Sequence, residues 1–170
     1  MLFRSISAGT IAVTTNDGLG TNGSGTTIGA SGTLDIQGVN YSTTEGLTVN
    51  GGTIKTSTGT STFAGAISLG ATSTVDVGGT QLTLSGIISG TSFGITKTSS
   101  GILILSGTNT YTGVTTINAG TLSVATIGNG GVAGNLGQAT NTASNLVLGG
   151  GTLQYTGSTA STDKIGRAHV

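Results

Sequence analysis

A short pattern of Gly, Thr, an aliphatic residue, any residue and a second aliphatic residue returns along this chain. Its copies, some of them degenerate, begin at Gly9, Gly32, Gly52, Ser73, Gly101, Gly120 and Gly151. Apart from longer gaps before Gly101 and Gly151, each copy starts roughly 20 residues after the one before it, an interval within the range of known repeat families. A period of this kind indicates a repeat architecture, in which each repeat is one small structural unit.

Each copy alternates with a period of two, which places its two aliphatic residues on one face of a β-strand. Gly, Ser and Thr interrupt every window in which a helical stripe could form. Shorter strands are expected between the copies, at 47–49, 67–69, 115–117 and 146–148. Two or three short strands in each turn of about 20 residues predict an all-β solenoid rather than a sandwich of hairpins.

If about eight turns stack at ~4.8 Å each, the solenoid is a rod roughly 40 Å long. Inward aliphatic residues form its core, and each buried Val, Ile or Leu contributes ~1.5–3 kcal/mol of transfer free energy. Thr suits the outward positions because it is β-branched and polar, and Gly suits corners that need positive φ. The residues predicted to point inward are Ile11, Val13, Leu34, Ile36, Ile54, Val75, Val77, Leu103, Leu105, Leu122, Val124 and Leu153.

Two isoleucines test this register. If Leu103 and Leu105 point inward, Ile102 and Ile104 point outward and need a cover. The preceding segment, residues 88–97 with Phe93, is the nearest candidate.

The composition excludes several classes of protein. The chain has 170 residues and no Cys, so it is not a disulfide-stapled domain. No apolar run reaches the ~18 residues that a membrane helix needs, and no signal peptide opens the chain. Only five Lys and Arg residues are present. They form no basic patch, so no nucleic-acid partner is expected.

Both ends resemble translated sequencing-adapter sequence. Residues 2–5, Leu-Phe-Arg-Ser, can be encoded by CTC TTC CGA TCT, and the reverse complement read in another frame encodes Lys-Ile-Gly-Arg, as at 164–167. Processing scars are set aside before fold reasoning. We therefore expect artefacts at 1–5 and 165–170 that make few contacts with the core. One β-helix segment then covers 6–164, with an irregular loop or turn at 125–145.

Residues 88–124 carry the most specific motif of the chain. Ile88-Ser89-Gly90 and Ile95-Thr96-Lys97 are followed by SGILILSGTNTYTGVTTINAGTLSV, from Ser100 to Val124. This stretch closely resembles the autotransporter-associated β-strand repeat, found in the passenger regions of bacterial autotransporters. The Leu-Ser-Gly, Asn-Thr-Tyr-Thr-Gly, Thr-Thr-Ile and Ala-Gly-Thr-Leu parts of that repeat match Leu105 through Leu122. The family's usual Gly after Tyr-Thr-Gly is Val114 here.

The resemblance implies a single-stranded, right-handed parallel β-helix that lies outside the cell. It also implies tethering to the bacterial outer membrane through a segment outside this sequence. A role as a structural or adhesive surface segment follows, and its partners would be molecules of host or bacterial cell surfaces. The open turns at the two ends of such a segment could also join copies end to end.

Catalysis is not expected, and no catalytic, cofactor-binding or metal site is assigned. With His169 set aside there is no His or Cys to serve as the base of a catalytic triad. The alternative is a carbohydrate-active β-helix with paired carboxylates on an outer sheet. Asp35 and Asp76 occupy equivalent outward positions two turns apart, about 9–10 Å, near the ~6.5–9.5 Å of inverting glycosidases. Lys55 lies between them and would neutralise the pair.

Two glycine-rich segments are candidate ligand sites. Residues 16–23, Asn-Asp-Gly-Leu-Gly-Thr-Asn-Gly, are similar to a calcium-binding nonapeptide, but a single copy with one carboxylate lacks the ligands that neighbouring turns supply. An ordinary polar loop is favoured there. The run 128–131 follows no strand and opens no helix, so it is not a phosphate loop.

Overall fold

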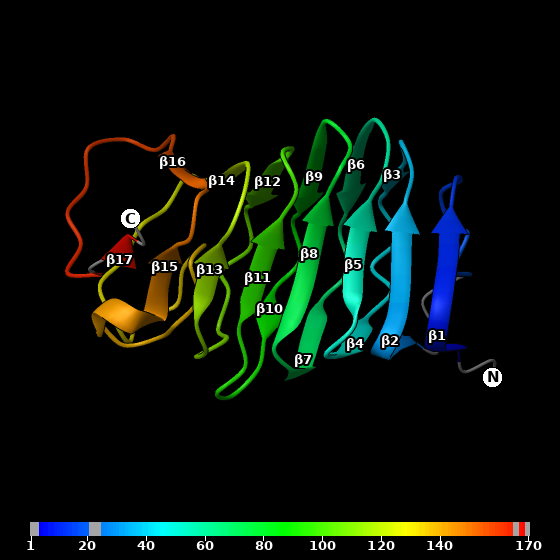
Figure 1. Cartoon of the computed structure of the whole chain (residues 1–170), viewed down its shortest axis with the longest axis horizontal. Helices are drawn as coiled ribbons and strands as arrows, with labels where there is room; N and C mark the ends of the chain where they lie inside the picture. The colour runs from blue at the N-terminus through cyan, green and yellow to red at the C-terminus, as the bar shows by residue number, and fades with distance from the viewer. Residues whose placement is uncertain (1–3, 21–24, 165–166, 169–170) are drawn as a thin grey trace.

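The computed structural model describes residues 4–20, 25–164 and 167–168, the last two by their backbone alone. Within these residues the chain is a β-solenoid whose strands pair in parallel, turn upon turn. The turns stack along the long axis of the molecule, and the two ends of the chain lie at opposite ends of the stack (Figure 1). The helical content of the described residues is one short 3₁₀ turn, η1 (Ala143–Asn145).

The strands form three columns, called here the first, second and third faces. β1 (Arg4–Val13) and β2 (Thr26–Ile36) are long enough to contribute to both the first and the second face. The first face continues with β4 (Leu47–Asn50), β7 (Ile67–Ala71) and β10 (Ile88–Ser89). The second face continues with β5 (Thr53–Thr56), β8 (Ser73–Val77), β11 (Ile95–Thr98), β13 (Thr115–Ile117), β15 (Leu146–Leu148) and β17 (Arg167–Ala168). The third face holds β3 (Asn40–Tyr41), β6 (Thr60–Phe63), β9 (Gln81–Leu84), β12 (Ile102–Leu105), β14 (Thr121–Val124) and β16 (Thr152–Tyr155).

The predicted turn length is confirmed by the strand register. Leu34 pairs with Ile54 and Ile54 with Val75, so the strand partners follow the period of the sequence pattern. Ile102 likewise pairs with Thr121 on the next turn. The third face gains one strand per turn and has six strands, so the expected eight turns are corrected to about six. The difference arises because residues 125–142 and 156–164 lengthen the chain without adding a strand to the third face.

The repeat copies do not form one column, as the shared pattern suggested. Copies beginning at Gly32, Gly52 and Ser73 lie on the second face, whereas those at Gly101, Gly120 and Gly151 lie on the third. The same pattern serves both faces because each strand that follows a corner needs a Gly, a β-branched outward residue and alternating inward aliphatics. The longer interval between Ser73 and Gly101 is therefore one turn plus one change of face.

The core is the column of inward aliphatic residues. Ten of the twelve residues predicted to point inward are buried: Val13, Leu34, Ile36, Ile54, Val75, Val77, Leu103, Leu105, Leu122 and Val124. Leu153 is half-buried and packs against this core. Ile11 is 38% exposed, although it pairs in register with buried Leu34. The shared register places Ile11 on the inward face as predicted, and it is exposed because β1 pairs only with β2, so no described strand covers its other side.

The corners need glycine for two different reasons. Gly51, Gly59 and Gly120 have φ values of 84°, 67° and 64°, a region that glycine enters without steric cost. Gly101 does not adopt such a φ. A Cβ at Gly101 would instead collide with the carbonyl of Gly79 in the preceding turn, so close stacking of corners requires glycine there.

The expectation that the ends make few contacts is wrong for the end residues that the structure describes. Arg4 and Ser5 pair with Thr26 and Thr27, and residues 167–168 pair with β15. An exposed strand edge pairs with any extended segment beside it, so pairing does not identify the origin of those residues. Their adapter origin stays a prediction, and residues 1–3, 165–166 and 169–170 lie outside the described part.

Candidate functional surface

Two columns of hydroxyl side chains run along the rod. On the second face, outward residues of consecutive turns pair in register, and all are threonine: Thr10, Thr33, Thr53, Thr74, Thr96 and Thr116. On the first face the outward column is Ser5, Thr27, Thr48, Ser68 and Ser89. Cross-strand pairs of Thr and Ser stabilise neighbouring strands. They also leave two long strips of the surface polar but uncharged.

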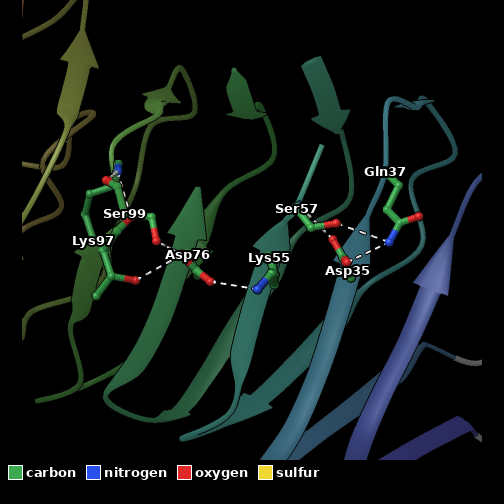
Figure 2. Close-up of polar contacts among 8 residues, drawn as sticks. Asp35, Gln37, Lys55, Ser57, Asp76, Lys97 and Ser99 are labelled. Atoms are coloured by element: carbon green, nitrogen blue, oxygen red, sulfur yellow. Dashed lines mark hydrogen bonds and ion pairs between the residues drawn. The ribbon is translucent and has the colours of Figure 1, made fainter. Parts of the chain in front are cut away.

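A charge column lies beside the threonine column, as the sequence predicted. Asp35 pairs in register with Lys55, and Lys55 with Asp76, on adjacent strands of the second face. Figure 2 shows the three side chains on the same side of the sheet. The assignment of these residues to stacked turns is therefore confirmed.

Lys55 pairs with only one of its two aspartate neighbours. Its Nζ lies 3.1 Å from Oδ2 of Asp76. Asp35 instead accepts hydrogen bonds from the Gln37 side chain at 2.8 Å and from the Ser57 backbone N–H at 2.9 Å (Figure 2). Asp35 is buried, so its charge is satisfied by these local donors rather than by Lys55.

Asp76 accepts hydrogen bonds from two hydroxyl groups beside its ion pair with Lys55. Burial alone would raise its pKa. Hydrogen bonds from the Ser99 and Thr98 hydroxyls and the neighbouring Lys55 ammonium together hold the pKa of Asp76 below its usual 3.8. A general acid near neutral pH needs the opposite shift.

The paired-carboxylate alternative gains no support from this geometry. Asp35 is buried and bonded to two donors, and Asp76 is ion-paired and kept ionised. The third residue of the column, Lys55, stands between them in the sheet.

Sequence reasoning missed a buried lysine on the same face. Lys97 alternates with Thr96 and Thr98, and its strand neighbours are inward Val75 and Ile117. It is fully buried. Its ammonium donates to the carbonyls of Thr98, Ser99 and Ala119 at 2.8, 2.7 and 3.2 Å.

Lys97 therefore joins two successive corners of the solenoid. Burial lowers its pKa, and the nearby Asp76 carboxylate opposes that shift. The signal was present in the sequence, since the alternation that buries Ile95 also buries Lys97.

The predicted register of the isoleucines is confirmed. Leu103 and Leu105 are buried, whereas Ile102 and Ile104 are half-buried. Ile102 is flanked by Gln81 and Thr121 on the neighbouring turns. Phe93 packs against the core, and cover of the two isoleucines by residues 88–97 stays a prediction.

Where it is described, the loop considered as a calcium site is bound to the next turn. Asn16 and Asp17 contact Ser42 and Thr43 of the next turn through side-chain hydrogen bonds. The residues described contain no group of three or more His, Cys, Asp or Glu side chains that could hold a metal ion. Residues 21–24 lie outside the described part, as does His169.

The buried carboxylate of Glu45 links the first three strands of the solenoid. Glu45 accepts hydrogen bonds from the Thr26 hydroxyl at 2.6 Å and the Tyr41 hydroxyl at 3.2 Å, and Arg4 lies 3.7 Å away. Burial and the Glu45 charge raise the pKa of Tyr41 to about 12. The Tyr41 ring stacks on Phe63 of the next turn with ring centroids 5.4 Å apart.

An expanded corner follows β14. Thr121 pairs with Thr152 on the next turn, but the chain between them carries the extra segment 125–142, which regular turns lack. Buried Asn135 anchors the extra chain, because its side chain donates to Gly107 and accepts from the N–H groups of Ala125 and Thr126. The corner is therefore a pinned loop that stays part of the stack.

The Asn-Thr-Tyr-Thr-Gly run of the preceding turn also binds this corner. Asn109 donates to the carbonyl of Asn135 at 2.8 Å, and its carbonyl side-chain oxygen accepts from the Ile88 N–H at 2.8 Å. Tyr111 is fully buried and its hydroxyl lies 2.7 Å from that of Thr115. The Asn-Thr-Tyr-Thr-Gly run thus ties three turns together.

Within the described ranges 4–20, 25–164 and 167–168, no helix is long and apolar enough to cross a membrane. No solved structure matches this chain. The Passenger-associated-transport-repeat family model matches residues 95–124. The chain is also similar to the adhesin BmaC autotransporter of Brucella suis biovar 1 (strain 1330), at 36% identity over 140 residues. That match covers 82% of the chain and 4% of the length of the adhesin.

Proposed function

Because the chain belongs to the autotransporter passenger-repeat family, we propose that it is a non-catalytic, adhesive segment of a rod displayed on a bacterial surface. The parent protein would hold this segment outside the cell, tethered to the outer membrane. Its partners would be molecules of host or bacterial cell surfaces.

One observation carries this proposal: the two uninterrupted hydroxyl columns on adjacent faces of the rod. Five and six consecutive turns present Ser or Thr in register. A stacked solenoid with such a surface is stiff, soluble and able to make many weak polar contacts along its length. The similarity to a named adhesin supports the same role.

The charges of the surface argue against an enzyme. Asp76 is ion-paired and Asp35 is buried among donors. A role in polysaccharide hydrolysis would need one carboxyl group that stays protonated near neutral pH.

Adhesion can be measured with beads that carry the folded chain. We expect such beads to be retained on cultured epithelial cells or on a bacterial lawn more than beads carrying the same chain after urea unfolding. Replacing both carboxylates, Asp35→Asn with Asp76→Asn, should leave retention unchanged if the variant stays folded by circular dichroism. Equal retention of beads carrying folded and unfolded chains would contradict the adhesive role. The segment would then act only as a spacer in the rod.

A further inference from the structure

Two Asn-Gly pairs of the described chain differ in how their backbone is held. In such a pair the backbone nitrogen of Gly can attack the carboxamide carbon of Asn, because Gly has no side chain to block the approach. Asn50-Gly51 forms the corner between β4 and β5, and Asn129-Gly130 lies in the expanded corner. The third pair, Asn22-Gly23, falls outside the described residues.

The Asn129-Gly130 pair is restrained on both residues. The Gly130 N–H donates to the Asp163 carboxylate at 2.6 Å, and the Asn129 side-chain oxygen accepts from the Asp163 N–H at 3.2 Å. A hydrogen bond to a charged acceptor is among the stronger ones in proteins. The nucleophilic nitrogen of this pair is therefore occupied.

The Asn50-Gly51 pair is open by comparison. Asn50 is exposed and ends its strand at a shift of register against β7. Among the described residues, the Gly51 N–H has no hydrogen-bond partner, and the Asn50 side chain lies against Gly70 without a hydrogen bond. Gly51 is half-exposed, so water reaches its backbone.

We infer that Asn50 is a site of spontaneous modification, which converts to aspartate and isoaspartate in the folded protein. The Gly51 nitrogen attacks Cγ of Asn50 and loses its proton, and the side-chain amide leaves as ammonia. The resulting five-membered succinimide then takes up water at either carbonyl, which gives aspartate or isoaspartate. Each conversion adds one negative charge to an uncharged corner, and isoaspartate also lengthens the backbone there.

Peptide mapping by mass spectrometry tests this inference on the whole 170-residue chain. The folded protein is held at mildly alkaline pH, and acid and isoaspartate forms are quantified at residues 50 and 129 over time. We expect conversion at Asn50 to be at least about tenfold faster than at Asn129. At Asn129 the hydrogen bond from the Gly130 N–H to a charged carboxylate must break before the nitrogen can attack, and the cost of breaking it slows the reaction by about that factor. Asn50→Gln should abolish the signal at position 50, since a glutamine ring closes slowly.

A second variant reverses the protection. Asp163→Ala removes the acceptor of the Gly130 N–H, so conversion at Asn129 should rise about tenfold while that at Asn50 stays the same. In urea the two sites should convert at similar rates. Conversion at Asn129 equal to that at Asn50 in the folded protein, or conversion at Asn50 only in urea, would overturn the inference. It stands independently of the proposed adhesive function.

Discussion

Individual polar residues inside this solenoid act mainly by joining successive turns. Lys97 caps carbonyls of two corners, Glu45 gathers donors from three segments, and Asn135 holds the expanded corner. Among the described residues, no buried side-chain nitrogen or oxygen lacks a hydrogen-bond partner. Because an unsatisfied buried group costs about 1–3 kcal/mol, these residues are the sensitive points of a core that is otherwise aliphatic.

Lys97→Met should destabilise the protein more than the same change at a partly exposed lysine. Met fills a similar volume but leaves three carbonyls without their donor, so the loss should be about 1–3 kcal/mol. Lys55→Met is the matched control, because an ion pair near the surface contributes only about 0–1 kcal/mol. Urea unfolding followed by circular dichroism measures both, and equal losses would refute the capping role of Lys97.

Tyr41 should make the protein sensitive to alkali. Its pKa is about 12 in the folded state against an ordinary 10.0, so the unfolded chain loses the phenol proton first as pH rises. Stability should therefore fall between pH 10 and 12, by at most about 3 kcal/mol at about 1.36 kcal/mol per pKa unit. In urea titrations across that range, Tyr41→Phe should flatten the fall. A slope unchanged by Tyr41→Phe would assign alkaline sensitivity to other groups.

At the scale of strands and corners, register is enforced by what each face buries. A slip of one residue in β8 would expose Val75 and Val77 and turn the Asp76 carboxylate toward the core. The charge column adds a smaller preference for the same register.

Reversing the charge of Lys55 tests the charge column. Lys55→Ala should cost about 0–1 kcal/mol. Lys55→Glu places three negative charges on neighbouring strands and should cost up to about 1 kcal/mol more at low salt. The difference in unfolding free energy between the two variants should decrease at high ionic strength because exposed charges are screened. Equal urea midpoints at low salt would show that the column has no energetic role.

The expanded corner should open without its anchor. Asn135→Ala removes the donor to the buried Gly107 carbonyl and the acceptor shared by the part-buried N–H groups of Ala125 and Thr126, and it should cost about 2 kcal/mol. Hydrogen exchange of residues 125–142 should accelerate in this variant. Asn129→Ala, at an exposed position of the same corner, is the control and should leave exchange near Ala125 unchanged. Unchanged exchange in Asn135→Ala would mean that other contacts hold the corner.

The whole molecule is a rod whose first described strand has a free edge. β1 is ten residues long, and apart from its pairing with β2 it has no strand beside it in the described chain. The Val13 carbonyl accepts from Gln37 on the β2 side, so alternation directs the backbone groups of Ala12 toward the free edge. Unpaired edges of this length favour association with other strands.

We expect the purified chain to self-associate through such an end. Light scattering should show a mean mass that rises with concentration. Ala12→Pro removes a free-edge donor and should lower that mass, whereas Thr159→Pro, in an exposed loop, should not. A stable monomer at high concentration would contradict end-to-end association.

The sequence alone determined the solenoid, the turn length, the inward column and the family. The solenoid, the turn length and the inward column follow from local alternation and from a period of about twenty residues. The family follows instead from the resemblance of residues 88–124 to its repeat. It also placed Asp35, Lys55 and Asp76 on adjacent strands, because their spacing equals one turn.

Only the tertiary structure decided which face each strand joins, since one pattern serves two faces. It also decided that Asp35 bonds to Gln37 and Ser57 while Lys55 selects Asp76. Burial of Lys97 and anchoring by Asn135 depend on carbonyls that corners bring together from different turns. These contacts join residues that lie about one turn or more apart in the chain. Whether they form depends on the backbone conformation of the corners, which the alternation of side chains within a strand does not predict.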